Sequence, residues 1–460
     1  MKRKQIGKIT LKSVIYFLAF VVPVVALTYF IFTRANAALI APPEQPFTGA
    51  AFPSPAHDPT KPTVALIASN NGTEITDLLA PYEVFAASGA FNVYTVAPKR
   101  EFTPFMWGGV DIMPHYSFAE LDKLLGKNPE VVVIPFIKDY DNQEIIQWIR
   151  THAGPQTQTL SICGGALVLA GTGLLDGGKA TTHQGVFPLL TKQFPQVELV
   201  RGVRYVDNGN TITSAGITAG IDASLHIVRK LVGRAIAVAT AQKMNYPYVQ
   251  FLDDPTFQPP ALPTVAVTDL NAGFLWQKRQ FGVYLYEGVG ETDLTALLDT
   301  YGRTYTARTL TFAETRAIIR SRHGLYLIPR WTMADVKGIS RVMVPGNRAA
   351  ISNVAALEEW AQQTHKLPVE YLYQSGDTTT FAFAVTLPDL ARWSNSADAR
   401  SSAATLEYPS EGLDLGNRRW AFWRLIPTLL VGVVAVAIIY ALDRRVSKWR
   451  SRLTLQPMPA

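Results

Sequence analysis

The sequence predicts an α/β protein in which a parallel sheet is covered by helices on both faces. A second, degenerate α/β copy follows, and two transmembrane helices flank the pair. Three observations predict this. Short, almost wholly apolar segments alternate with helical ones from residue 62 onward, as is typical of buried parallel strands. A similar succession begins again near residue 281. Two uncharged apolar runs, each long enough to cross a bilayer, lie near the ends.

The two apolar runs cover residues 14–32 and 425–442, and basic residues lie outside both. Residues 1–12 carry five Lys or Arg, and residues 443–460 carry five together with one Asp. Positive flanks favour the cytoplasmic side, so we expect both tails in the cytoplasm and the domains between them outside it. Residues 35–37 (ANA) resemble a signal-peptidase site, so a cleaved leader is the alternative to an uncleaved anchor.

Charge and composition exclude several classes of function. The tails sum to +9 and the whole chain to +7, so the region between them is slightly acidic. The basic pI therefore belongs to the tails, and no nucleic-acid partner is predicted. The seven histidines are scattered and no phosphate-binding glycine loop is present, so neither a metal nor a cofactor is predicted. One cysteine allows no disulfide within the chain.

The first α/β region alternates strands and helices in a regular order. Strands are expected at 63–68, 91–97, 130–135, 158–162 and 211–214, and helices at 75–89, 143–151, 164–174 and 219–241. In such sheets the chemistry lies at the carboxyl ends of the strands.

The second region repeats the first in weakened form. The segment 281–301 echoes 64–85, and the tripeptide TDL occurs in both. Pro345 follows an apolar strand as Pro135 does in the first region. Beyond that point the repeat fails: residues 369–385 contain no cysteine and are predicted to form two strands.

These patterns give a complete division of the chain. It comprises a tail (1–12), a transmembrane helix or signal anchor (13–33), a linker (34–61), the first domain (62–250), a linker (251–272), the second domain (273–390), a tether (391–420), a transmembrane helix (421–442) and a tail (443–460).

Cys163 is the strongest candidate for chemistry. An apolar strand ends at this residue, Gly164 and Gly165 follow, and a helical segment begins. A thiol at a sharp strand-to-helix turn is the cysteine form of a nucleophile elbow. The first N–H groups of the helix favour a thiolate there, so we expect a lowered thiol pKa. The alternative is a buried structural cysteine.

Three blocks carry a family resemblance: TDLLAPYEVF (76–85), SICGGALVLAGTGLLDGGKATTH (161–183) and TSAGITAGIDASLHIV (213–228). Together they resemble the ThiJ/PfpI family of the class I glutamine amidotransferase-like superfamily. The match is closest to its isonitrile-hydratase branch and to the sensor halves of AraC-type regulators. The resemblance implies a flavodoxin-like sandwich, a nucleophilic Cys163 and, in many members, a homodimer.

The resemblance also implies partners for the thiol. An acid from the first loop touches the sulfur, and it falls on Asp77, whose alternative role is to cap the following helix. The other candidate, Glu83, is expected to face solvent. His183 lies near the elbow and is either a catalytic residue or a loop residue with a structural hydrogen bond. The backbone N–H groups of Gly164 and Gly165 would hold an oxyanion.

Two positions depart from the family pattern. Gly164 stands where isonitrile-hydratase-like members have threonine, and Phe136 stands where the family has glycine after the strand-ending proline. The lost glycine removes an oxyanion donor, which typically costs about 10²–10³ in rate.

The functional hypothesis is a membrane-anchored, cysteine-dependent hydrolase or hydro-lyase acting on a small electrophile. Its alternatives are a ligand or redox sensor at the bilayer and a scaffold that uses the fold only for binding. The expected partners are a small molecule and the lipid bilayer, with a second copy of the chain where a homodimer forms.

Overall fold

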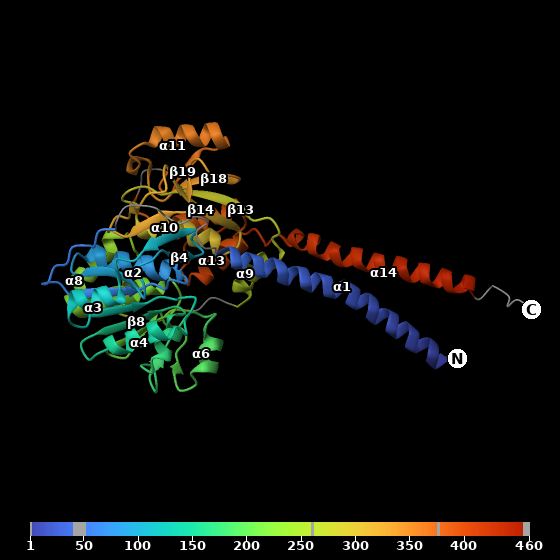
Figure 1. Cartoon of the computed structure of the whole chain (residues 1–460), viewed down its shortest axis with the longest axis horizontal. Coiled ribbons are helices and arrows are strands. Elements are labelled where there is room, and N and C mark those ends of the chain that lie inside the picture. Colours follow the sequence, from blue (N-terminus) through green and yellow to red (C-terminus); the bar gives the residue numbers. More distant parts are fainter. Residues whose placement is uncertain (1, 40–51, 259–261, 375–377, 454–460) are drawn as a thin grey trace, which may run out of the picture. The chain divides into compact units, whose positions relative to one another are not determined.

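The computed structural model describes residues 2–39, 52–258, 262–374 and 378–453, coloured along the chain in Figure 1. The chain divides into two compact units. One contains Met1–Ala38, Asp269–Gln277 and Trp420–Ala460, and the other contains Leu39–Thr268 and Lys278–Arg419. We call them the apolar-helix unit and the α/β unit.

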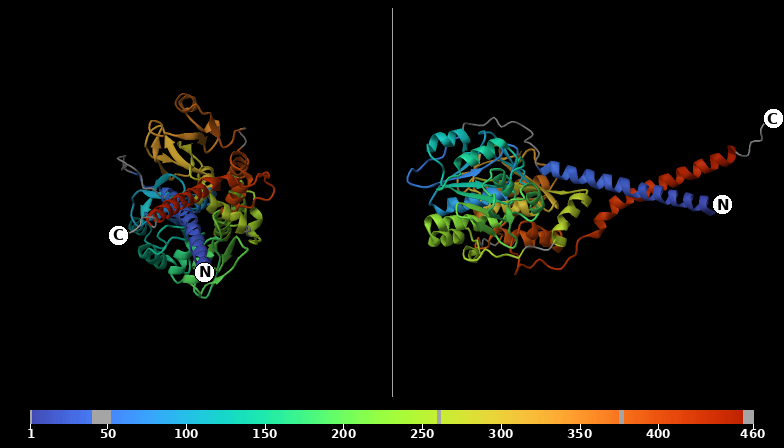
Figure 2. Two further views of the ribbon diagram at one scale, coloured as in Figure 1. Left: turned by 90° about the vertical axis from the view of Figure 1, so that its right-hand side faces the viewer. Right: turned by 90° about the horizontal axis from the view of Figure 1, so that it is seen from below.

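The apolar-helix unit is built on α1 (Lys2–Leu39) and α14 (Ile426–Leu453), which cross in Figure 2. An ion pair of 2.7 Å joins Lys12 Nζ to Asp443 Oδ2. A Cβ on Gly432 would lie 2.7 Å from the Phe20 ring, so glycine permits the close approach of the two helices. Within the described residues, Leu11–Ala37 and Phe422–Trp449 are long and apolar enough to cross a membrane.

The first α/β copy covers residues 63–243. Its strands are β1 (Thr63–Ile67), β2 (Thr73–Glu74), β3 (Asn92–Ala97), β4 (Thr103–Met106), β5 (Val110–Met113), β6 (Tyr116–Ser117), β7 (Val131–Ile134), β8 (Gln158–Ile162), β9 (Lys179–Ala180), β10 (Glu198–Leu199), β11 (Tyr205–Asp207) and β12 (Thr211–Ser214). Its helices are α2 (Ile75–Ser88), α3 (Phe118–Leu125), α4 (Gln143–His152), α5 (Gly165–Gly171), α6 (Phe187–Gln193), α7 (Ala219–Val232) and α8 (Arg234–Lys243).

Seven of these strands form one sheet in the order β11-β12-β8-β7-β1-β3-β6. Every neighbouring pair is parallel except β11–β12. Along β1, Val64 and Leu66 enter one hydrophobic cluster and Ala65 and Ile67 another. The sheet is therefore covered on both faces, which confirms the predicted flavodoxin-like sandwich. The helix expected over 219–241 divides into α7 and α8 at Gly233, whose φ is +102°.

The second copy covers residues 279–393. Its elements are β13 (Arg279–Tyr284), α10 (Glu291–Gly302), β14 (Ala307–Ala313), β15 (Ile319–Arg320), β16 (Tyr326–Pro329), β17 (Trp331–Thr332), β18 (Ile339–Val344), α11 (Val354–Trp360), β19 (Val369–Tyr371) and α12 (Ala382–Trp393). Its parallel sheet has the order β17-β14-β13-β18-β19. This repeats the first-copy order β6-β3-β1-β7-β8, so the second copy has the same topology but ends one strand pair earlier.

Three predictions about the later part of the chain are wrong. The second strand expected within 369–385 is instead the start of α12. The predicted tether (391–420) contains a mostly buried helix, α13 (Ser396–Thr405). The predicted linker 251–272 includes part of α9 (Leu262–Phe274). Of the predicted linker 34–61, residues 40–51 lie outside the described residues.

The two copies also share a mixed sheet, ordered β15-β16-β5-β4-β2. Strand β5 of the first copy pairs antiparallel with β16 of the second. Helices α2 and α10 pack against each other in the same hydrophobic cluster, labelled close together in Figure 1. The α/β unit is therefore built from two copies joined by main-chain pairing and by a helix pair.

Candidate functional site

Cys163 lies between β8 and α5 with φ of +54°, a left-handed conformation that non-glycine residues rarely adopt. Two hydrogen bonds hold it there. The Cys163 N–H donates to the Ala215 carbonyl at 3.0 Å, and Thr182 Oγ1 donates to the Cys163 carbonyl at 2.6 Å. A strained residue fixed at the end of a central strand is the geometry of a nucleophile elbow. The side chain is only 4% exposed.

The expectation of a lowered thiol pKa is wrong. Burial raises the pKa of Cys163 well above its ordinary value, and the nearby Asp77 carboxyl raises it further. The Arg303 guanidinium and the Gly164 N–H act in the opposite direction but do not compensate. The cysteine therefore rests as a thiol at neutral pH, and its chemistry needs a group that takes the proton.

Asp77 lies in the first turn of α2, is fully buried and acts electrostatically on the Cys163 thiol. Its Oδ2 accepts a hydrogen bond of 3.1 Å from the Phe136 N–H, and its Oδ1 has no hydrogen-bond partner among the described residues. Burial raises the pKa of Asp77 to about 6, against the opposing effects of Glu74 and Arg303. Asp77 is therefore mainly ionised at neutral pH and suited to accept a proton.

Glu74, which the sequence reasoning missed, caps α2 in place of Asp77. Its Oε2 accepts the Asp77 N–H at 2.5 Å, so the predicted capping role of Asp77 is wrong. Burial and the Asp77 charge raise the pKa of Glu74 to about 7. The sequence signal that could have identified Glu74 is its position three residues before Asp77, at the start of the predicted helix. Two buried acids thus stand near the sulfur.

Arg303, from the end of α10 in the second copy, is a further residue that sequence reasoning missed. Its guanidinium forms an ion pair with Glu74 and lies with its Cζ 4.5 Å from the centre of the Trp107 ring. It acts electrostatically on both Asp77 and Cys163. The site is therefore formed by both copies, and no motif within either copy indicates it.

Phe136 and Gly164, the two positions that depart from the family pattern, lie against each other in the structure. A Cβ on Gly164 would lie 2.3 Å from Phe136 Cδ2, so the ring leaves room only for glycine. A Cβ on Gly165 would lie 2.0 Å from the Ile134 carbonyl oxygen, so α5 approaches β7 too closely for any side chain there. The Phe136 N–H, which could hold a substrate oxygen, is committed to Asp77.

His183 does not meet the thiol through its ring nitrogens. Nδ1 accepts the Gly185 N–H at 3.1 Å, and Nε2 bonds the Thr405 carbonyl at 2.9 Å. Burial lowers the pKa of His183. A neutral ring with both nitrogens bonded to the main chain supports the structural role that the sequence left open.

The second copy holds a counterpart of the elbow. The β7–β8 and β18–β19 registers place Ser161 and Tyr371 at equivalent positions, so Tyr373 corresponds to Cys163. Its hydroxyl donates to Asp293 Oδ1 at 2.7 Å, and Asp293 is the counterpart of Asp77. A cavity of about 400 Å³ adjoins both residues. Tyrosine removes the nucleophile but preserves the contact with the acid.

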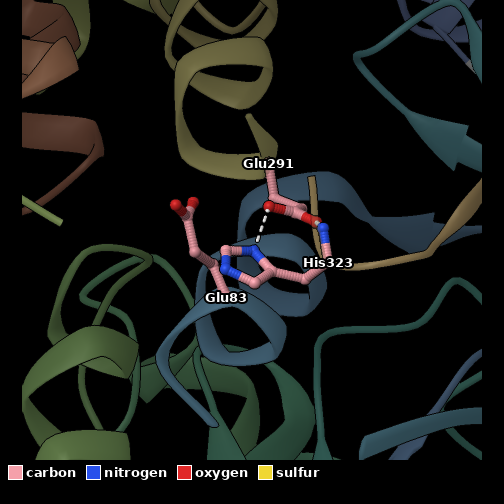
Figure 3. A group of neighbouring side chains, drawn as sticks. All are labelled: Glu83, Glu291 and His323. Atoms are coloured by element: carbon pink, nitrogen blue, oxygen red, sulfur yellow. Dashed lines mark hydrogen bonds and ion pairs between the residues drawn. The ribbon is translucent and has the colours of Figure 1, made fainter. Parts of the chain in front are cut away.

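A second cluster of charged groups lies between the copies, where Glu83, Glu291 and His323 point toward one another (Figure 3). The prediction that Glu83 faces solvent is wrong, because its side chain is buried. His323 Nδ1 bonds Glu291 Oε2 at 2.8 Å, and Arg322 lies 3.4 Å from Glu83 Oε1. Because Glu83 of the first copy contacts Arg322 of the second, we assign the cluster to the junction of the copies.

Replacing Glu83 with glutamine is expected to stabilise the protein at pH 8 but not at pH 5. Burial and the Glu291 charge raise the pKa of Glu83 from 4.5 to about 7. A raised carboxyl pKa contributes stability that is present below pH 4.5 and lost as the pH rises through 7, by roughly 3 kcal/mol at most. Glutamine keeps the acceptor for the Thr292 N–H without that loss.

Thermal melting at the two pH values measures this difference. Glu287→Gln, at an exposed carboxylate, is the matched control and should change neither melting temperature appreciably. Equal destabilisation of Glu83→Gln at both pH values would show that the Glu83 charge supports the junction.

Comparisons with known proteins find a family match within the first copy. The DJ-1/PfpI family matches residues 63–230. An isonitrile hydratase of Pseudomonas putida is 30% identical over 177 residues, 37% of this chain and 72% of that protein. The HTH-type transcriptional regulator CdhR of Pseudomonas aeruginosa is 33% identical over 99 residues, 22% of this chain and 29% of the regulator.

Among solved structures, a ThiJ/PfpI family protein from Pseudomonas syringae is 25% identical with a TM-score of 0.37, covering 44% of this chain and 78% of its own. Drosophila melanogaster DJ-1beta is 21% identical with a TM-score of 0.37, covering 41% and 100%. The chain belongs to the DJ-1/PfpI family.

Proposed function

We propose that this protein is a membrane-anchored, cysteine-dependent hydratase or hydrolase of small neutral electrophiles. One observation carries the proposal: Cys163 is held in a left-handed elbow and is acted on electrostatically by Asp77, a buried acid whose Oδ1 has no hydrogen-bond partner among the described residues. The pair provides a nucleophile and a proton acceptor at one point of the sheet.

The charges of the site define what each group must do. Since Cys163 rests as a thiol, it must lose its proton as it attacks, and the Asp77 carboxylate is the nearby acceptor. With an isonitrile, sulfur would bond to the terminal carbon, and the proton taken by Asp77 would be delivered to the substrate, giving a thioimidate. Water would then add to this carbon and the C–S bond would break, releasing an N-substituted formamide and the thiol. The net reaction consumes one water.

The enclosure of the site favours small and uncharged substrates. Cys163 is almost fully buried, and the Phe136 ring lies against the elbow at Gly164. A charged substrate would lose its hydration on entry. The isonitrile hydratase relative makes short alkyl isonitriles the first compounds to test.

The experiment uses the full chain in detergent, incubated with short alkyl isonitriles, aldehydes and primary amides. Formation of N-alkylformamide, followed by NMR, supports the proposal. Ser224→Ala changes a buried hydroxyl in α7 and controls for the effects of substitution and purification. Its rate of product formation should match that of the natural chain. No turnover of any of the three classes would contradict the proposal.

A ligand sensor is the second candidate, and the commitment of the Phe136 N–H to Asp77 favours it. Without that oxyanion donor, the site could bind an electrophile and not turn it over. Binding by calorimetry in the absence of product distinguishes the two functions. A peroxide sensor is less well supported, because burial raises the pKa of Cys163 and so depletes the reactive thiolate.

The proposed location places the α/β unit outside the cytoplasm. The two helices that could cross a bilayer end in the basic tails, which favour the cytoplasmic side. Protease added to intact spheroplasts should then remove the α/β unit but not a tag at either terminus.

A further inference from the structure

The two copies are related by an internal two-fold arrangement. The TDL tripeptides at 76 and 292 are 216 residues apart, and the same spacing relates β5 to β16. In the antiparallel pair of these strands, Val110 lies opposite Pro329 and Met113 opposite Tyr326. Each strand thus pairs with its own counterpart in the other copy, as in the isologous interface of a symmetric dimer.

The helix pair obeys the same relation. Thr292 N–H donates to the Glu83 carboxylate at 2.7 Å, and the counterpart of Thr292, Thr76, donates from its hydroxyl to Asp299. Asp299 is in turn the counterpart of Glu83 at the same spacing. The two bonds therefore join counterpart residues in both directions, and α10 packs against α2.

This relation is broken at Arg303. The residue 216 positions earlier is Ala87, so only the second copy supplies a guanidinium. Arg303 is 7% exposed, pairs with Glu74 and lies 3.5 Å from Asp299 Oδ1. A buried cation is costly unless its charge is paired, and here two carboxylates of different copies pair with it.

We propose that the second copy serves as a built-in partner for the first, and that Arg303 is the positioning residue it contributes to the Cys163 site. The proposal rests on the proposed function, since it assigns Arg303 to the same cysteine. Arg303 holds Glu74 by an ion pair, and Glu74 accepts the Asp77 N–H. Asp77 in turn accepts the N–H of Phe136, whose ring lies against Gly164, the residue that follows Cys163. Arg303 is also the cation whose charge opposes the two acids at the sulfur.

The test is the pH dependence of iodoacetamide alkylation in the full chain. Cys163 is the only cysteine, so intact mass reports this site alone. Arg303→Met and Arg303→Gln should both move the alkylation midpoint to higher pH, by roughly 1–2 pH units. Arg303→Lys keeps the charge, so its alkylation midpoint should lie close to that of the natural chain. The test requires only that one of these two neutral variants is folded, which a cooperative thermal melt establishes.

Arg330→Met provides the matched control. Arg330 is another buried arginine at the junction, paired with Asp111 at 2.6 Å. Its loss should weaken the fold without moving the alkylation midpoint. An unchanged midpoint in a folded neutral Arg303 variant, or an equal shift in Arg330→Met, would overturn the proposal. Alkylation needs no substrate, so the two proposals can fail separately. A protein that shows the shift in the Arg303 variants but turns over none of the test substrates would contradict the proposed function and not the role of Arg303.

Discussion

Replacing Cys163 with alanine is expected to abolish turnover of any substrate found, and replacing Asp77 with asparagine to lower kcat by about 10²–10⁴-fold. The first change removes the only atom that can form the covalent bond. The second keeps the shape of Asp77 and an acceptor for the Phe136 N–H, but it removes the group that takes the thiol proton. Steady-state rates of N-alkylformamide formation measure both effects.

The pH profile separates a proton carrier from a structural acid. With the pKa of Asp77 raised to about 6, kcat/KM should rise as the pH passes through 6 and Asp77 loses its proton. Asp77→Asn should lose this limb, whereas Ser224→Ala should retain it. A normal rate and profile in Asp77→Asn would exclude Asp77 as the proton acceptor. A limb that persists near pH 7 in this variant would point to Glu74 instead.

Local patterns were sufficient to predict the elbow and the sheet around it. The strand ending at Cys163, the glycines after it and the apolar strands are all encoded within a few residues, and the structure places them as expected. Asp77 was located by its place in a family block, and in the structure it is buried and acts electrostatically on the thiol.

The rest depends on contacts between distant segments. Arg303 reaches the site across 140 residues of sequence, and no local pattern indicates which arginine will be buried there. The thiol pKa was predicted in the wrong direction because the helix effect is local, whereas the burial that raises the pKa is not encoded in the local sequence. The Thr- and Phe-rich segment before α12 favours a strand on composition, but packing against α10 makes Ala382–Trp393 helical.

The repeat explains why the chain departs from its family at the elbow. Phe136 and Gly164 compensate each other, since the ring fills the space that a side chain at 164 would need. The first copy has lost the glycine after Pro135, whereas the second keeps Gly346 after Pro345 and has lost the cysteine. Neither copy alone retains the whole family pattern at the elbow.

The two elbow glycines should respond differently to alanine. Gly164→Ala places a methyl group 2.3 Å from the Phe136 ring, and overpacking of this kind costs about 1–3 kcal/mol. Gly165→Ala places one 2.0 Å from the Ile134 carbonyl oxygen, which can move only if β7 separates from β8. We expect Gly165→Ala to cost more than about 3 kcal/mol or to prevent folding.

A second substitution distinguishes the two cases. Phe136→Ala removes the ring that opposes a methyl group at 164, so Gly164→Ala should cost little in that background, with a coupling of at least about 1 kcal/mol. Phe136→Ala should not reduce the loss of stability caused by Gly165→Ala, because the atom that a methyl group at 165 would meet is the Ile134 carbonyl oxygen of the main chain. Gly154→Ala, which meets only the Asn128 amide at 3.4 Å, should remain within about 0.5 kcal/mol of the natural chain. Chemical denaturation of the four single variants and two double variants measures these differences. Rescue of Gly165→Ala by Phe136→Ala would show that the ring, and not the close approach of α5 to β7, sets the shape of the elbow.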